Sequence, residues 1–284
     1  MSAPVERIIE IEGLTLTALC WGPDTAPAVL CLHGWLDNAA SFAPLAAELQ
    51  DVHLIALELP GHGHSDHLPP GVPYHAVDSV VRVLDAAAVL GLERFMLMGH
   101  SMGAGVACLL AGAFPDKVSK LVLLDGLGPR SIEADGSPGL LQEYRAAQLQ
   151  GRRPSLGRGA SMETAVRARL SGGYPVSEAS ARLLVARGTR PVEGGFVFRA
   201  DKRLRYAGPA RMDEQHIRAF LAQIRSESLL VMGSEGLMLG PAVMRERVAL
   251  IPGLRTVTVS GGHHVHMDDA PAVAAYVSPF LVPG

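Results

Sequence analysis

The sequence predicts an α/β fold with a parallel sheet, interrupted once by a helical insertion. Three observations predict it. Short β-rich runs alternate with longer segments of helical periodicity. Several of these runs, such as AVLCL at 28–32 and FMLM at 95–98, are continuously apolar, as strands covered on both faces are. From about 130 to 210 the apolar density falls while Gly, Pro, Arg and Ser become more frequent, which indicates an insertion.

The predicted elements follow one another in a strand–helix–strand order, which favours right-handed crossovers between parallel strands. The strands are predicted at 5–11, 14–21, 28–32, 53–57, 95–98, 118–124, 228–232 and 255–259. Helices of the core are predicted at 42–50, 75–90 and 102–113, and shorter amphipathic ones in the insertion at 139–150, 161–171 and 177–187. The core therefore comprises 1–129 and 211–284, and the insertion comprises 130–210.

Composition excludes several classes of protein. The 284 residues are 48% hydrophobic and 19% charged, as in globular proteins. A net charge of -3 gives no reason to expect a nucleic-acid or anionic-membrane partner, and no apolar run reaches the ~20 residues of a membrane span. Residues 1–13 carry charges where a secretory signal is apolar, and Cys20, Cys31 and Cys108 are odd in number and set among apolar residues. We expect a cytoplasmic protein with buried thiols and no cofactor; the sequence predicts no oligomeric state.

One serine, Ser101, stands between two glycines in GHSMG, after the predicted strand 95–98 and before the predicted helix 102–113. This context is typical of a nucleophile on a sharp strand-to-helix turn. Because the serine backbone is strained there, the residues two positions away must lack bulk. The helix N-terminus would favour negative charge at the reaction site. Ser101 is therefore predicted to be a nucleophile, and a chance match in a glycine-rich chain is the competing interpretation.

A hydrolytic serine also needs donors for an oxyanion. The turn HGW at 33–35 follows the predicted strand 28–32, so the backbone N–H groups of Trp35 and Met102 are the predicted donors. A plain turn at the end of a buried strand is the competing interpretation. Three further residues of these turns are expected to lie near the substrate: His33, Gly34 and His100.

The general base is expected late in the chain, where SGGHHVHMDD follows the predicted strand 255–259. His263, directly after Gly262, is the predicted base, with His264 and His266 as alternatives. Two groups of residues have side chains that can bind a metal. The first, in this late segment, is His263, His264, His266, Asp268 and Asp269, and the second, earlier in the chain, is His62, His64, Asp66 and His67. Neither has H-E-x-x-H spacing or a cysteine partner, so no metal is predicted.

Together, these motifs resemble the α/β-hydrolase superfamily over nearly the whole chain. The stretches that carry the resemblance are WGP (21–23), LHGWLDNAASF (32–42), ALELPGHGHSD (56–66), GHSMGA (99–104), FPDKVSKLVLLD (114–125) and GGHHVHMDDAPAV (261–273). The chain is most similar to the serine hydrolase-like proteins, also through LLVARGT (183–189) and FRADKRLR (198–205). The resemblance implies an eight-stranded, mostly parallel sheet with helices on both faces, a helical cap inserted after strand six, and a Ser-acid-His triad containing Ser101 and His263.

The acid of that triad has two candidates. Many members of the superfamily carry it in the loop after strand seven, where this chain has Glu235 and Gly236 in MGSEGLM. Some members use the end of strand six instead, which corresponds to Asp125 in KLVLLD. We favour Asp125, because Glu235 is displaced by one residue from the expected position, and we keep Glu235 as the alternative.

These residues predict a serine hydrolase that cleaves a small ester-like substrate through an acyl-enzyme at Ser101. A serine rather than an aspartate on the turn argues against haloalkane or epoxide opening. The main alternative is a ligand-binding protein on the same fold, with a weak or idle triad. A third hypothesis is carbon–carbon bond cleavage by the same Ser-His pair.

Overall fold

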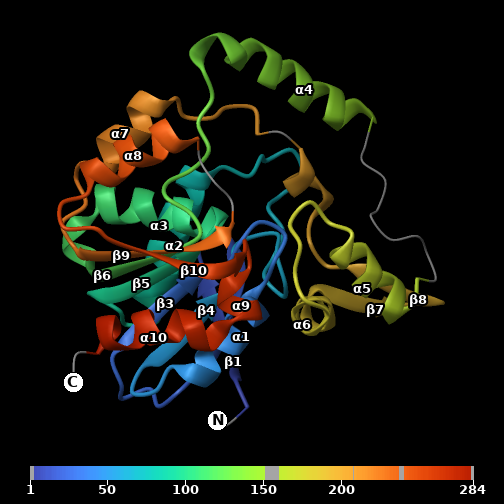
Figure 1. Ribbon diagram of the computed structural model, residues 1–284. Coiled ribbons are helices and arrows are strands. Elements are labelled where there is room, and N and C mark those ends of the chain that lie inside the picture. Colours follow the sequence, from blue (N-terminus) through green and yellow to red (C-terminus); the bar gives the residue numbers. More distant parts are fainter. Residues whose placement is uncertain (1–2, 151–159, 207, 237–239, 283–284) are drawn as a thin grey trace.

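The computed structural model describes residues 3–150, 160–206, 208–236 and 240–282. An eight-stranded sheet lies at its centre (Figure 1), in the order β1-β2-β4-β3-β5-β6-β9-β10. Strand β2 pairs antiparallel with β1 and β4, and every other pair is parallel. The strands are β1 (Val5–Ile11), β2 (Leu14–Trp21), β3 (Ala28–Leu32), β4 (His53–Leu57), β5 (Phe95–His100), β6 (Val118–Leu124), β9 (Glu227–Glu235) and β10 (Arg255–Gly262). The predicted mostly parallel sheet is confirmed.

Helices cover both faces of the sheet (Figure 1). Each face has its own apolar cluster. One cluster joins the sheet to α2, α3 and α7, through side chains such as Val83, Leu110 and Ile217. The other joins it to α1 and α10, through Leu45 and Val277. The core helices are α1 (Ala43–Glu48), α2 (Ala76–Val89), α3 (Met102–Ala113), α7 (Glu214–Leu221), α8 (Pro241–Leu250), α9 (Val265–Asp268) and α10 (Ala270–Leu281).

Between β6 and β9 the chain leaves the sheet and forms the insertion, with α4 at the top of Figure 1 and its other elements at the right. It contains α4 (Ser137–Gln150), α5 (Met162–Leu170), α6 (Glu178–Gly188), β7 (Thr189–Val192) and β8 (Gly195–Phe198). The β7–β8 hairpin was not predicted, because its strands have four residues each and include Arg190 and Pro191. Single 3-10 turns are η1 (Ala39–Phe42), η2 (Pro115–Lys117), η3 (Ala134–Gly136) and η4 (Lys202–Arg205).

The insertion is fixed to the core at the loops that follow β3 and β4. Arg187 of α6 binds the fully buried Glu58, with Nε 2.7 Å from Oε1 and Nη2 2.9 Å from Oε2. The indole Nε1 of Trp35 donates to the carbonyl oxygen of Leu204 at 2.8 Å. These contacts hold the insertion beside the carboxyl edge of the sheet, where both loops begin.

The structure also bears on the expectations for the cysteines and for membrane-spanning segments. The three cysteines are free and buried, as predicted. Within the part of the chain that the structure describes, no helix combines the length and the apolarity that a bilayer span requires.

Candidate active site

Ser101 lies on a strained turn between β5 and α3. Its φ of 53° and ψ of -112° belong to a region that L-residues rarely adopt. A Cβ on Gly99 would lie 2.5 Å from the carbonyl oxygen of Gly103, and a Cβ on Gly103 would lie 2.0 Å from that of Leu32. The prediction that positions two residues from Ser101 must lack bulk is therefore confirmed. Met102 becomes the first residue of α3, so its N–H has no acceptor within the helix.

Ser101, His263 and Asp125 form a continuous line of hydrogen bonds. The Oγ of Ser101 lies 2.8 Å from Nε2 of His263, and Nδ1 of His263 lies 2.5 Å from Oδ2 of Asp125. A carboxylate that faces Nδ1 keeps the imidazole proton there, which leaves the Nε2 lone pair to accept the hydroxyl proton. The second carboxylate oxygen of Asp125 accepts the N–H of Gly233 at 3.0 Å, so the acid is itself oriented.

Of the two carboxylates that the sequence offers as the acid of the triad, the structure brings Asp125 to His263. Asp125 is 3% exposed, whereas Glu235 is at the exposed end of β9. Gly236 leaves room for the Asp125 carboxylate, because a Cβ at position 236 would lie 2.1 Å from Oδ1. Position 236 can therefore carry no side chain while Asp125 lies here.

The turn after β3 is held by His33, which is fully buried. Its Nδ1 donates to the carbonyl oxygen of Gly34 at 2.8 Å, and its Nε2 accepts the N–H of Leu59 at 3.1 Å. These two bonds fix the peptide between Gly34 and Trp35, whose N–H is one of the predicted oxyanion donors. The side chain of Trp35 is 43% exposed and meets the insertion.

His100 is fully buried next to the candidate triad. Its Nε2 donates to the carbonyl oxygen of His263 at 2.9 Å, and the two rings lie 4.7 Å apart between centroids. Burial, together with the neighbouring His266 and His264, holds the pKa of His100 well below its usual value. His100 is therefore neutral, with its lone pair on Nδ1, so it makes no hydrogen bond to Asp37, and its Nε2–H supports the backbone of His263.

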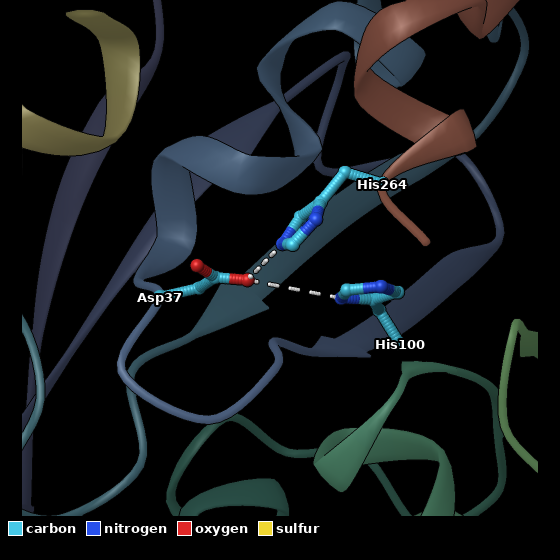
Figure 2. A group of neighbouring side chains, drawn as sticks. All are labelled: Asp37, His100 and His264. Carbon is cyan, nitrogen blue, oxygen red and sulfur yellow. Dashed lines mark hydrogen bonds and ion pairs between the residues drawn. The ribbon is translucent and has the colours of Figure 1, made fainter. Parts of the chain in front are cut away.

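Figure 2 shows that the side chains of Asp37, His100 and His264 point toward one another. Oδ2 of Asp37 lies 3.1 Å from Nε2 of His264 and 3.8 Å from Nδ1 of His100. Burial alone would raise the pKa of Asp37, but the hydrogen bond with His264 and the charge of Arg169 outweigh it. The pKa of Asp37 is thus held below its usual range, and the carboxylate is ionised although it is 4% exposed.

Asp37, His100 and His264 also have the side chains of a metal site, with one ligand atom from each within 4.8 Å of the others. However, Nη2 of Arg169 in α5 lies 3.2 Å from Oδ1 of Asp37 and 3.0 Å from Nε2 of His264. A guanidinium in contact with two of the three ligand residues takes the place of a cation, so we interpret the group as an ion-pair network. Among the described residues, neither of the two histidine-rich groups considered from the sequence forms such a cluster by itself.

Asp37 and Arg169 were not among the residues predicted for the site. Asp37 could have been found, because it lies in HGWLDNAASF, two residues after Trp35. Arg169 lies in a stretch of the insertion without any recognisable motif. Its contact with Asp37 spans 132 residues of sequence, which no local pattern reveals.

Comparisons with known proteins agree with this fold. A family model described as alpha/beta hydrolase fold matches residues 27–156. The eight-stranded sheet, the strained serine turn and this match place the protein in the class of α/β-hydrolase-fold proteins. The chain belongs to the α/β-hydrolase family. A serine hydrolase-like protein of Danio rerio is 32% identical to it over 93% of this chain and 84% of that protein.

Solved structures resemble the whole chain. The hypothetical protein PA1622 from Pseudomonas aeruginosa PAO1 superposes with a TM-score of 0.91 and 39% identity over 99% of both chains. The thioesterase domain from the curacin biosynthetic pathway superposes with a TM-score of 0.83 and 26% identity, over 97% of this chain and 99% of that domain. Both comparisons include the insertion as well as the sheet, since almost all of each chain is covered.

Proposed function

We propose that this protein is a serine hydrolase that cleaves small ester-like substrates through an acyl-enzyme on Ser101. One observation carries the proposal: the hydrogen-bonded line from Asp125 through His263 to Ser101, with its 2.5 Å and 2.8 Å contacts. The strained backbone of Ser101 supports it, because that strain presents the hydroxyl at the edge of the sheet.

In the proposed mechanism, Oγ of Ser101 attacks the substrate carbonyl while Nε2 of His263 takes the hydroxyl proton. The N–H groups of Trp35 and Met102 bind the oxyanion, and Asp125 stabilises the imidazolium that forms. His263 then gives its proton to the leaving alcohol. A water molecule attacks the acyl-enzyme with the same base, which frees the acid product and restores Ser101.

For His33 and His100 we propose positioning roles in place of the substrate contacts expected from the sequence. Both side chains are fully buried, and each donates a hydrogen bond to a backbone carbonyl oxygen, His33 to that of Gly34 and His100 to that of His263. Side chains committed in this way hold the oxyanion turn and the base. Gly34 is needed for space, since a Cβ there would lie 2.8 Å from Nδ1 of His100.

We further propose that the insertion, residues 130–210, serves as a cap over the site. Its contacts with Trp35 and Glu58 place it next to the turn that would bind the oxyanion. A roof anchored at these points favours a substrate small enough to be enclosed. The thioesterase name of a structural relative supports acyl transfer to water as the reaction class.

The proposal is tested with the purified protein on p-nitrophenyl acetate and butyrate and with a fluorophosphonate probe. We expect turnover of the short esters and covalent labelling of Ser101, and neither in Ser101→Ala. A wild-type protein that neither labels nor hydrolyses above the Ser101→Ala level would support the alternative of a ligand-binding protein. That alternative requires a weak or idle triad, and the hydrogen bond between Asp125 and His263 argues against one.

A further inference from the structure

We propose that Arg169 is a positioning residue. Through it, the insertion holds the histidine loop where His263 can take the hydroxyl proton of Ser101. The histidine loop is defined as residues 262–268. The inference rests on the proposed function, because it concerns how the base of that reaction is kept in place. It assigns a part in the reaction to a residue that lies outside the sheet and outside every motif of the sequence.

Arg169 joins three segments that are distant in the chain. Its Nη2 donates to Oδ1 of Asp37 at 3.2 Å, in the turn after β3. Oδ2 of the same carboxylate accepts the Nε2–H of His264 at 3.1 Å, so Asp37 links Arg169 to the histidine loop, and Nη2 itself lies 3.0 Å from that Nε2. Its Nη1 donates to the carbonyl oxygen of Tyr174 at 3.2 Å, just after α5. The Arg169 side chain is 17% exposed, so these bonds are largely shielded from water.

The positive charge of Arg169 compensates the buried negative charge of Asp37. Asp37 is an ionised carboxylate that is 4% exposed, and Arg169 is the cation that contacts it. Removal of one partner of a buried ion pair leaves the other uncompensated, which is strongly unfavourable. Without Arg169, Asp37 would have to bind a proton or a water molecule, and the imidazoles that lie next to it are those of His264 and His100.

The imidazoles of His264 and His100 are both connected to the candidate base, His263. His264 is the next residue after His263, and the carbonyl oxygen of His263 accepts a hydrogen bond from His100. A shift of either imidazole therefore changes the backbone position of His263. Misplacement of a catalytic group by about 1 Å can cost about 100-fold in rate.

A second route connects Arg169 to the same base. The ring of Tyr174 lies 4.8 Å from the ring of His263 between centroids, at an interplanar angle of 43°. Because Arg169 holds the carbonyl oxygen of Tyr174, the guanidinium controls the ring that packs on His263 as well as the loop that carries it. The far end of the histidine loop is tied to the insertion separately, by Asp268 and Ser180 at 2.6 Å.

The chain offers two matched controls for Arg169. Arg187 is also an arginine of the insertion that pairs with a buried carboxylate of the core, Glu58. Its ion-pair partners, Glu58 and Glu6, lie outside the histidine loop. Arg182 forms ion pairs with Glu163 and Glu178 inside the insertion and is 46% exposed. Arg187→Ala thus loosens the insertion elsewhere, and Arg182→Ala removes a surface charge only.

The experiment measures kcat and KM on p-nitrophenyl acetate, the rate of fluorophosphonate labelling, and Tm for the three alanine variants. For Arg169→Ala we expect kcat and labelling to fall about 10- to 100-fold with little change in KM. Added guanidinium ion, at millimolar concentrations below those that denature, is expected to restore part of this loss. For Arg182→Ala we expect kcat close to that of the wild type. For Arg187→Ala, which removes an anchor of the proposed cap, we expect a lower Tm and a smaller fall in kcat than for Arg169→Ala.

The inference is overturned if folded Arg169→Ala keeps the wild-type kcat and labelling rate. It is also overturned if its loss equals that of Arg187→Ala and does not respond to guanidinium, since the insertion would then act only as a whole. If Arg169→Ala does not fold, Arg169→Gln decides by the same readouts, because it keeps most of the length without the charge. Failure of the proposed function is distinguishable, because the wild type itself would then neither label nor hydrolyse.

Discussion

Gly236 lies directly against the carboxylate of Asp125, so that a Cβ at position 236 would come within 2.1 Å of Oδ1. The two positions belong to the ends of adjacent strands, β6 and β9, which pair in parallel. In α/β hydrolases either strand end can supply the acid, and here the absence of a side chain at one end makes space for the acid at the other. The two positions are therefore coupled.

We expect Gly236→Ala to lower kcat by about 10- to 100-fold, because the added methyl group must push the Asp125 carboxylate away from His263. Gly240→Ala is the matched control in the same region, since a Cβ there would meet no atom of the described, non-adjacent residues within 4 Å. The measurement is kcat on p-nitrophenyl acetate together with Tm. Equal activity of the two variants would show that Asp125 does not depend on this space.

A second prediction separates the two candidate acids. We expect Asp125→Asn to lower kcat by up to about 10⁴-fold, because an amide no longer stabilises the imidazolium or fixes its tautomer. Glu235→Gln should leave kcat close to that of the wild type, because Glu235 is exposed at the end of β9. Steady-state kinetics of both variants check this, and a larger loss in Glu235→Gln would reverse the assignment.

Sequence patterning predicted the sheet well, because β3, β4, β5 and β6 each contain a continuous apolar run, as strands covered on both faces of a parallel sheet do. Helices α7, α8 and α10 were not predicted individually, although α3 was located at its correct ends. The GHSMG turn and His263 could be found because their chemistry requires a local motif. Asp37 lies in such a motif, but its partners could not be predicted, because its contacts with His264 and Arg169 span 227 and 132 residues.

A third prediction concerns Arg247, which is fully buried at the base of the insertion. It binds Glu214 through Nε and Nη2 at 2.8 Å and 2.7 Å, and the carbonyl oxygens of Leu127 and Pro129 through Nη1. We expect Arg247→Met to lower the free energy of unfolding by about 3 kcal/mol, because these acceptors lose their donor. Urea unfolding measures the change.

The control for Arg247→Met is Arg218→Ala, which removes the exposed pair between Arg218 and Glu246 at 3.1 Å. Exposed pairs contribute about 1 kcal/mol or less, so this variant should unfold close to the wild type. Similar losses in the two variants would contradict the assignment of a structural role to the buried guanidinium.

The last prediction concerns pH and the buried histidines. Burial and the neighbouring His264 lower the pKa of His266 to about 3, and burial and His33 lower that of His62 to about 3. In the unfolded chain each imidazole has a pKa of about 6.5. Between these values the unfolded chain binds protons that the folded protein excludes. The free energy of unfolding should therefore fall as pH is lowered below about 6.5, by about 1.4 kcal/mol per pH unit for each such histidine.

Carboxylates do not explain such a loss, because the lowered pKa values of Asp37 and Glu58 start from ordinary values of 3.8 and 4.5 and remove stability only at lower pH. Urea unfolding at pH 7, 6 and 5 measures the slope. His266→Leu is the decisive variant, because both ring nitrogens of His266 lack a hydrogen-bond partner among the described residues. We expect it to be at least as stable as the wild type at pH 7 and to reduce the slope by about 1.4 kcal/mol per pH unit. An unchanged slope in that variant would show that another group takes up the proton.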